Sequence, residues 1–207
     1  DPIAASITKE VYGPDADWIQ MGFRFNGSGS EDAKLLRLTD MILSNSKAGL
    51  IDINLKQQQK VIEPASYVDY LNDYSIHTFS GRPREGQSLD DVKKLLLEQI
   101  ELVKKGEFED WLIEATINDL RKSSIRSSEN NYARSNNFVM AFTNSIPWQN
   151  YIGQIDDLKK YTREDIMKFA NEHYKDNYVA IYKRNGKDAN TLKVTKPSIT
   201  KVSLNKE

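Results

Sequence analysis

The order of the predicted strands and helices constrains the fold of this chain more than any other feature of its sequence. A strand at 18–25 is followed by a helix, then by two strands within 66–80, then by several helices, and a last strand lies at 178–183. The strands of a parallel α/β sheet alternate one by one with helices, and these strands do not. The sequence therefore predicts an α+β fold built on an antiparallel sheet.

The strand at 18–25 is predicted from a clear alternation of apolar side chains. These residues share one face, which we expect to be buried: Ile19, Met21, Phe23 and Phe25. A weaker alternation at 7–11 indicates a further strand. The polar run 26–30 then ends the strand at 18–25, and Ser30 is positioned to cap a helix that ends near residues 44–49.

Residues 50–80 are predicted to contain a short helix and a hairpin. The segment 50–61 begins apolar and ends in a glutamine-rich polar run, which we interpret as a short helix. The segments 66–71 and 74–80 have β-strand character, and Asn72 and Asp73 between them suit the turn of a hairpin. We expect these two strands to pair antiparallel.

Two helices are predicted from their capping signals. Ser88 followed by Asp91 is an acidic variant of a capping box, and the apolar stripe behind it ends at Gly106. Thr162 with Asp165 opens another capped helix, which ends near residue 174.

Amphipathic patterns predict two more helices, at 108–120 and 132–142. We interpret the serines between 123 and 128 as a polar helix face or a kink, because no nearby base could activate a hydroxyl. Residues 146–148 interrupt the helical pattern, and Ile155 with Leu158 suggests only a short turn.

Composition excludes several classes of partner. The 29 basic and 30 acidic residues leave a net charge of −1, so long-range attraction to nucleic acid or to an anionic membrane is not favoured. The absence of cysteine excludes disulfides and thiolate metal sites. The longest apolar runs fall well short of the ~20 residues that span a bilayer. We expect no nucleic-acid partner and no membrane span, and, because the chain begins at Asp1, a larger parent protein.

No motif in the sequence indicates metal binding or catalysis. The chain has two histidines, and neither has a second imidazole at metal-ligand spacing. In the segment 169–173 a Glu-His pair is present, but Phe169 stands where the first ligand would be. We interpret His173 as a polar residue at a helix C-terminus and His77 as a cross-strand partner in the hairpin. We therefore predict no catalytic and no metal-binding residue.

Two other clusters have structural interpretations. Acidic pairs such as Asp90–Asp91 and Asp156–Asp157 are expected at helix starts, where exposed amide groups stabilise negative charge. The segment Gly27–Gly29 lacks the spacing of a phosphate-binding loop, and we interpret it as a tight turn.

The chain resembles the insulinase/pitrilysin family of zinc peptidases, which includes the mitochondrial processing peptidases and the related respiratory-complex core proteins. The resemblance covers about residues 17–186, and it is distributed over the chain rather than fixed by one motif. It rests on four segments: 18–25, 49–61, 157–170 and 177–186. The resemblance implies an antiparallel sheet with helices packed on one face, in a domain that pairs with similar domains to enclose a peptide-sized chamber.

The resemblance also implies that this domain is not the catalytic one. The family's zinc-binding H-x-x-E-H helix is missing here. Another domain of the family uses an arginine and a tyrosine seven residues apart to hold the substrate carbonyl, and Asn54 and Val61 occupy those positions. We therefore expect the second domain of an N-terminal half, with no cofactor of its own, zinc in a neighbouring domain of the parent, companion domains as partners and peptides as the parent's substrates.

We predict one α+β domain at 1–190. A linker or tail follows at 191–207 and is similar to the linker that joins the family's two halves. One alternative is a scaffold or assembly protein that kept the fold and lost catalysis. Another is an unrelated α+β binding module. Family analogy suggests the bacterial periplasm or envelope.

Overall fold

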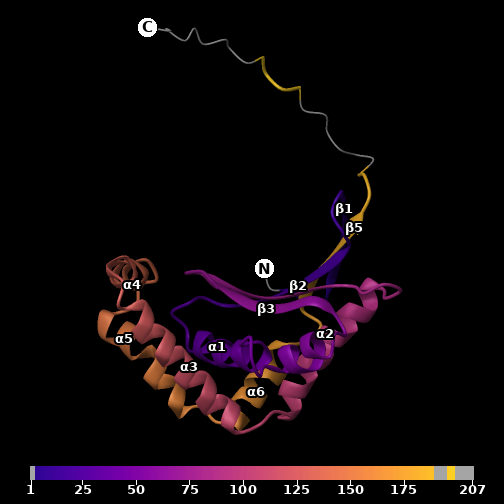
Figure 1. Cartoon of the computed structure of the whole chain (residues 1–207). Helices are drawn as coiled ribbons and strands as arrows, with labels where there is room; N and C mark the ends of the chain where they lie inside the picture. The colour runs from indigo at the N-terminus through magenta and orange to yellow at the C-terminus, as the bar shows by residue number, and fades with distance from the viewer. Residues whose placement is uncertain (1–2, 189–194, 199–207) are drawn as a thin grey trace.

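A single mixed sheet forms one layer of the molecule, and helices form the other. The computed structural model describes residues 3–188 and 195–198. Its five strands lie in the order β1-β5-β2-β4-β3, with the helices on one face (Figure 1). The strand bounds are β1 Ile7–Gly13, β2 Trp18–Asn26, β3 Ile62–Tyr70, β4 Tyr74–Arg82 and β5 Tyr178–Asn185. The predicted α+β class with helices on one face is confirmed, and the predicted tail falls mostly outside the described residues.

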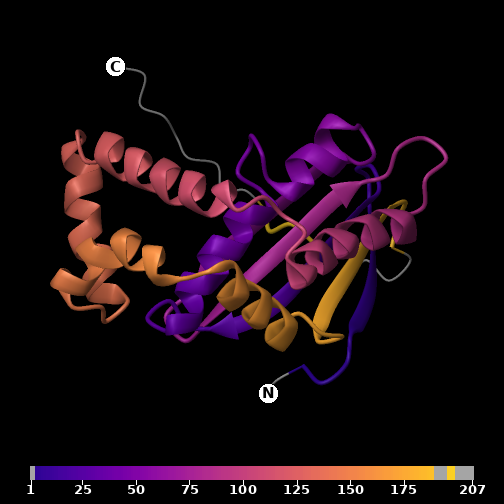
Figure 2. The same ribbon diagram turned by 90° about the horizontal axis from the view of Figure 1, so that it is seen from below.

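The helices divide into a group that packs on the sheet and a group that extends beyond it. Helices α1, α2 and α6 lie against the sheet, whereas α3, α4 and α5 extend past its end (Figure 2). The bounds are α1 Glu31–Leu43, η1 Asp52–Gln57, α2 Leu89–Lys105, α3 Trp111–Ser127, α4 Asn131–Thr143, α5 Trp148–Asp157, η2 Leu158–Lys160 and α6 Arg163–His173. In the described part of the chain, no helix is both long and apolar enough to cross a bilayer.

The edge strand β1 makes the sheet mixed rather than wholly antiparallel. It runs parallel to β5, from the pair Ile7 and Val179 to the pair Gly13 and Asn185, while the other strand pairs are antiparallel. The loop after β1 is tied to β5, because the buried ammonium of Lys183 donates hydrogen bonds to the carbonyls of Gly13 and Ala16 at 3.3 and 3.2 Å. The chain therefore reverses between β1 and β2, and β5 inserts between them.

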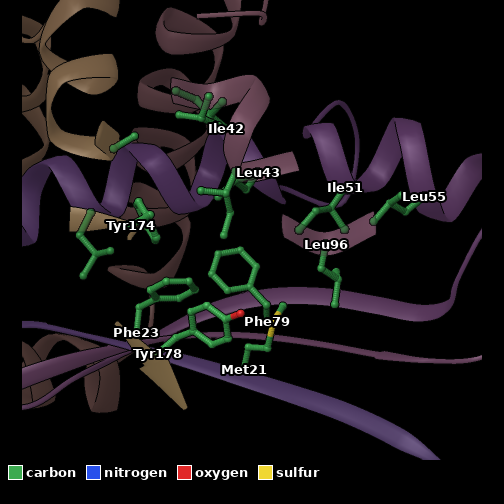
Figure 3. Close-up of a cluster of buried hydrophobic side chains, with 14 of the residues drawn as sticks. Met21, Phe23, Ile42, Leu43, Ile51, Leu55, Phe79, Leu96, Tyr174 and Tyr178 are labelled. Atoms are coloured by element: carbon green, nitrogen blue, oxygen red, sulfur yellow. The ribbon is translucent and has the colours of Figure 1, made fainter. Parts of the chain in front are cut away.

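One face of β2 forms the centre of the core. Its four alternating apolar residues are at most 3% exposed, as predicted from the sequence. Phe23 packs edge-on against Tyr174 and Phe79, with ring centroids 5.1 and 5.9 Å apart. Leucines and isoleucines of α1, α2 and the segment around η1 close the cluster from the helical side (Figure 3). Each fully buried aromatic side chain contributes on the order of 2–3 kcal/mol to the free energy of folding.

The local signals for caps and turns are confirmed. The Ser30 hydroxyl accepts a hydrogen bond from the backbone N–H of Ala33. Both predicted capping boxes are present, at the starts of α2 and α6. The segment after Gly49 is a short helix, most of it with π geometry, and β3 and β4 form the predicted hairpin.

Two predictions between residues 146 and 158 are wrong. The segment expected to be a short turn is the ten-residue helix α5. Pro147 does not break this helix but precedes its first turn, where a missing N–H costs nothing. Asp156 and Asp157 consequently lie at the end of α5 rather than at a helix start. Their charges are compensated by neighbouring cations, since Asp156 pairs with Arg121 and Asp157 with Lys34.

Replacing Gly27 with alanine should destabilise the fold by at least about 2 kcal/mol. A Cβ atom there would lie 1.9 Å from the carbonyl oxygen of Asn72, so the β2–α1 loop and the hairpin turn would have to separate. The matched control is Gly153→Ala in α5, where a Cβ meets nothing within 4 Å and alanine should stabilise by about 0.5–1 kcal/mol. Urea unfolding of both variants measures the difference, and equal midpoints would contradict the close approach.

Replacing Glu31 with glutamine should lower stability at pH 7 by about 0.5–1 kcal/mol. Hydrogen bonds from Lys34, Tyr161 and Lys160 lower the pKa of the Glu31 carboxyl from its ordinary 4.5 to about 2. Because this pKa is depressed in the folded state, the contribution is present above pH 4.5 and is lost as the pH falls towards 2. The free energies of unfolding of the unsubstituted chain and of the Glu31→Gln variant should converge as the pH falls through that window. The control is Glu172→Gln, which should change the free energy of unfolding little, because the pair of Glu172 with Lys168 spans 4.0 Å.

Candidate functional site

A buried polar network links β4 to β3, α1 and the end of α6. His77 on β4 is fully buried. Its Nε2 lies 2.7 Å from Ser66 Oγ and 3.1 Å from Asp40 Oδ1. Its Nδ1 lies 2.6 Å from the hydroxyl of Tyr174. The predicted cross-strand partner of His77 is therefore found in Ser66, and two further partners come from helical segments distant in sequence.

The proton positions in this network follow from its acceptors. The Ser66 hydroxyl donates to Asp40 at 2.6 Å, and a carboxylate can only accept. His77 Nε2 must therefore carry a hydrogen. With the hydrogen of the imidazole on Nε2, Nδ1 has a lone pair that accepts from the Tyr174 hydroxyl. Burial raises the pKa of Tyr174 well above its ordinary value, which keeps this donor protonated.

The network contains serine, histidine and aspartate but does not have the geometry of a hydrolase triad. In such a triad the serine and the carboxylate bind opposite ring nitrogens, and the serine faces substrate. Here Ser66 and Asp40 both lie at Nε2, and Tyr174 occupies Nδ1. The imidazole is enclosed and each of its nitrogens has a partner. The arrangement ties the sheet to its helices.

His173 lies beside the aromatic rings of Phe169 and Phe25. It is the last residue of α6, as predicted, and its ring lies 4.5 Å from that of Phe169 and 5.6 Å from that of Phe25. The ring of His77 also lies near Phe25, at 6.4 Å. Within residues 3–188 and 195–198, no three or more His, Asp or Glu side chains form a group that could hold a metal ion. That the chain has no metal or catalytic site stays a prediction.

Asn54 and Val61 face other parts of the fold. Asn54 in η1 is partly buried and donates a hydrogen bond to Gln99 of α2 at 2.8 Å. Val61 is 3% exposed, and its methyl group lies beneath Gly81 of β4. Neither side chain projects from the open side of the sheet. Their correspondence to the family's arginine and tyrosine stays a prediction.

The sheet face opposite the helices is uncovered (Figure 1). Because the buried positions of β2 point to the helices, the intervening positions and their registered partners point to the open side. This open sheet face includes Trp18, Gln20, Arg24, Tyr67, Asp69, Tyr74, Ile76, Val179 and Ile181. Gly22 lies at its centre and leaves room for Ile76, which a Cβ at position 22 would meet at 3.4 Å.

The open sheet face combines apolar and polar contact groups. Tyr67 is 43% exposed, and Ile76, Val179 and Ile181 are partly exposed. The guanidinium of Arg24 lies over the ring of Tyr74, 5.0 Å from its centroid. Such a surface provides aromatic and aliphatic contacts for an extended peptide or for another protein surface.

Comparison with known proteins gives a consistent assignment. The family profile described as peptidase M16 inactive domain matches residues 3–120, and no curated protein sequence matches. A protease from Helicobacter pylori is 16% identical with a TM-score of 0.82, covering 89% of this chain and 45% of that one. The inactive peptidase domain of a candidate zinc protease from Bordetella parapertussis is 14% identical with a TM-score of 0.71, covering 82% and 93%.

A chain of complex III2 from Candida albicans is also similar in fold. It is 11% identical with a TM-score of 0.65, and the match covers 86% of this chain and 45% of that one. In both comparisons the match therefore covers less than half of the other protein, the Helicobacter pylori protease and the Candida albicans chain.

Replacing Tyr174 with phenylalanine should destabilise the fold by about 1–3 kcal/mol. The change removes the hydroxyl that donates to His77 and leaves a buried acceptor without a partner. Tyr12→Phe is the matched control, because its hydroxyl also bonds to a side chain but the residue is 47% exposed, so a change within about 0.5 kcal/mol is expected. Thermal unfolding distinguishes the two, and equal losses would argue against the network.

Proposed function

Because the chain belongs to the peptidase M16 inactive-domain family, we propose that it is a non-catalytic structural domain of a larger zinc-dependent metalloendopeptidase. In that protein it forms part of the wall of a chamber that encloses peptides. We also propose that this chain is the second domain of an N-terminal half and lies next to a companion domain that binds zinc.

The observation that carries this proposal is the uncovered sheet face. Helices shield one side of the sheet (Figure 1). The side chains of the other side include apolar and aromatic groups that are partly or largely exposed. Exposed apolar surface of this kind marks an interaction site. A wall that contacts unfolded peptides needs broad, mixed contacts rather than a specific pocket, and the open sheet face provides them.

The chain's own histidines do not fit a zinc site. His77 is enclosed, and its Nε2 is taken up by Ser66 and Asp40 and its Nδ1 by Tyr174. His173 is packed among aromatic rings. Zinc and the water-activating glutamate therefore belong, in this proposal, to the companion domain, and no chemical step is assigned to this chain.

A scaffold role is the second candidate function. Its support is the similarity to a chain of complex III2 from Candida albicans. The two candidates differ in what the rest of the gene encodes. A peptidase predicts an H-x-x-E-H helix about one domain's length before Asp1, and a scaffold predicts none.

Replacing Ile181 with lysine should raise KM for peptide hydrolysis by about fivefold in the polypeptide that carries this domain and its companion. The change alters contacts that substrate and transition state share, so kcat should change little. Lys168→Glu on α6, on the helical side, is the control.

Two further measurements accompany the comparison of KM values. The 207-residue chain alone should not cleave peptides with added zinc, and cleavage or stoichiometric zinc binding by it would refute the proposal. Equal KM values for the two variants would remove the chamber role. A full polypeptide without zinc-dependent cleavage would favour the scaffold.

A further inference from the structure

Helices α4 and α5 carry apolar side chains that the described part of the chain does not bury. The pattern at 132–142 predicted an amphipathic helix, and α4 is indeed a helix there. However, α4 buries only Ala141, and α5 has no buried residue. Phe142 is 86% exposed and Phe138 is 57% exposed. Helices of this composition normally gain their stability by burying such a face.

A groove lies among α3, α4 and α5, which form three sides of a frame beyond the end of the sheet (Figure 2). Its volume is about 640 Å³. Phe138 and Trp148 stack in it with ring centroids 4.2 Å apart, and Tyr151 stacks on Trp148 at 5.7 Å. Leu120 and Ile152 add aliphatic walls. We refer to this hollow as the α3–α5 groove.

The charged side chains that line the α3–α5 groove are both arginines, Arg37 and Arg134, and no aspartate or glutamate lines it. Arg134 donates hydrogen bonds to the Ser128 carbonyl and the Asn131 side chain, which are neutral. Within residues 3–188 and 195–198, Arg37 has neither an ion pair nor a hydrogen bond to another side chain or to the backbone. Two positive charges thus lie beside an aromatic stack, and no carboxylate lines the groove with them.

We propose that the α3–α5 groove binds an acidic amphipathic peptide segment of another polypeptide. Leucine- or phenylalanine-sized side chains of that segment pack on the stack of Phe138, Trp148 and Tyr151. A carboxylate of the segment pairs with the guanidinium of Arg37, whose planar fork matches it. This site lies beyond the sheet and does not depend on the open sheet face.

Charge and shape favour a peptide over a nucleic acid. A single-stranded nucleic acid needs free aromatic faces for its bases and a positive track for its phosphates. In the groove the rings of Phe138 and Trp148 stack on each other, and the chain's net charge is −1. Aliphatic walls beside two cations instead match a segment that carries leucine on one helical face and glutamates beside it.

The test measures binding of a short, end-blocked, dye-labelled peptide in which leucines recur at helical spacing between glutamates. Fluorescence anisotropy with the 207-residue chain should show saturable binding that weakens with salt. Arg37→Glu and Trp148→Ala should each weaken binding by about tenfold. The matched controls Lys168→Glu and Tyr132→Ala, the latter a 79% exposed aromatic of α4 outside the groove, should leave it unchanged.

Several results would overturn this proposal. Two are binding results: the absence of saturable binding, or equal binding of a peptide with lysine in place of glutamate. The third is displacement of the labelled peptide by a single-stranded oligonucleotide but not by unlabelled peptide. The fourth is self-association of the chain that buries the groove against a second copy. Chemical-shift mapping on the unmodified chain keeps the test valid should a variant fail to fold. Peptide-induced shifts should concentrate in α3, α4 and α5, and shifts confined to other elements would refute the site.

Discussion

The packing of one face of β2 against α1, α2 and α6 is the interaction on which the rest of the structure depends. Phe23 and its neighbours on this strand contact side chains from both the sheet and the helices. Because α1, α2 and α6 all pack on this side and α3, α4 and α5 extend past the end of the sheet, the helices leave the other side uncovered in the described part of the chain. The layer order, the buried His77 network and the open sheet face all follow from this one-sided core.

The sequence predicts the parts of this fold that local patterns control. The alternation in β2 and the capping boxes at Ser88 and Thr162 are confirmed, because each depends on neighbours within a few residues. Helix α5 was missed because Pro147 was interpreted as a break, although proline suits the start of a helix. The parallel direction of β1 was missed because a strand pattern identifies a strand but not the direction of its partner.

The candidate site is predictable only in part. His77 occupies a position of β4 that faces the core, and a polar residue at such a position is the local signal that its side chain is enclosed. Its partners Asp40 and Tyr174 lie 37 and 97 residues away in sequence, and no local pattern indicates that they meet there. The open sheet face could be predicted only with knowledge of where the helices pack. The α3–α5 groove depends on the path of α5, which the sequence did not give.

The position of β5 between β1 and β2 has a consequence for synthesis of the chain. Ile7 pairs with Val179, and Trp18 pairs with Lys183, so the first two strands acquire this neighbour only after nearly the whole domain has left the ribosome. Contacts between residues so far apart in sequence slow folding. Until β5 arrives, β2 has an unpaired edge that can join another nascent chain. The edge of β2 is therefore closed only at the end of the synthesis of the domain.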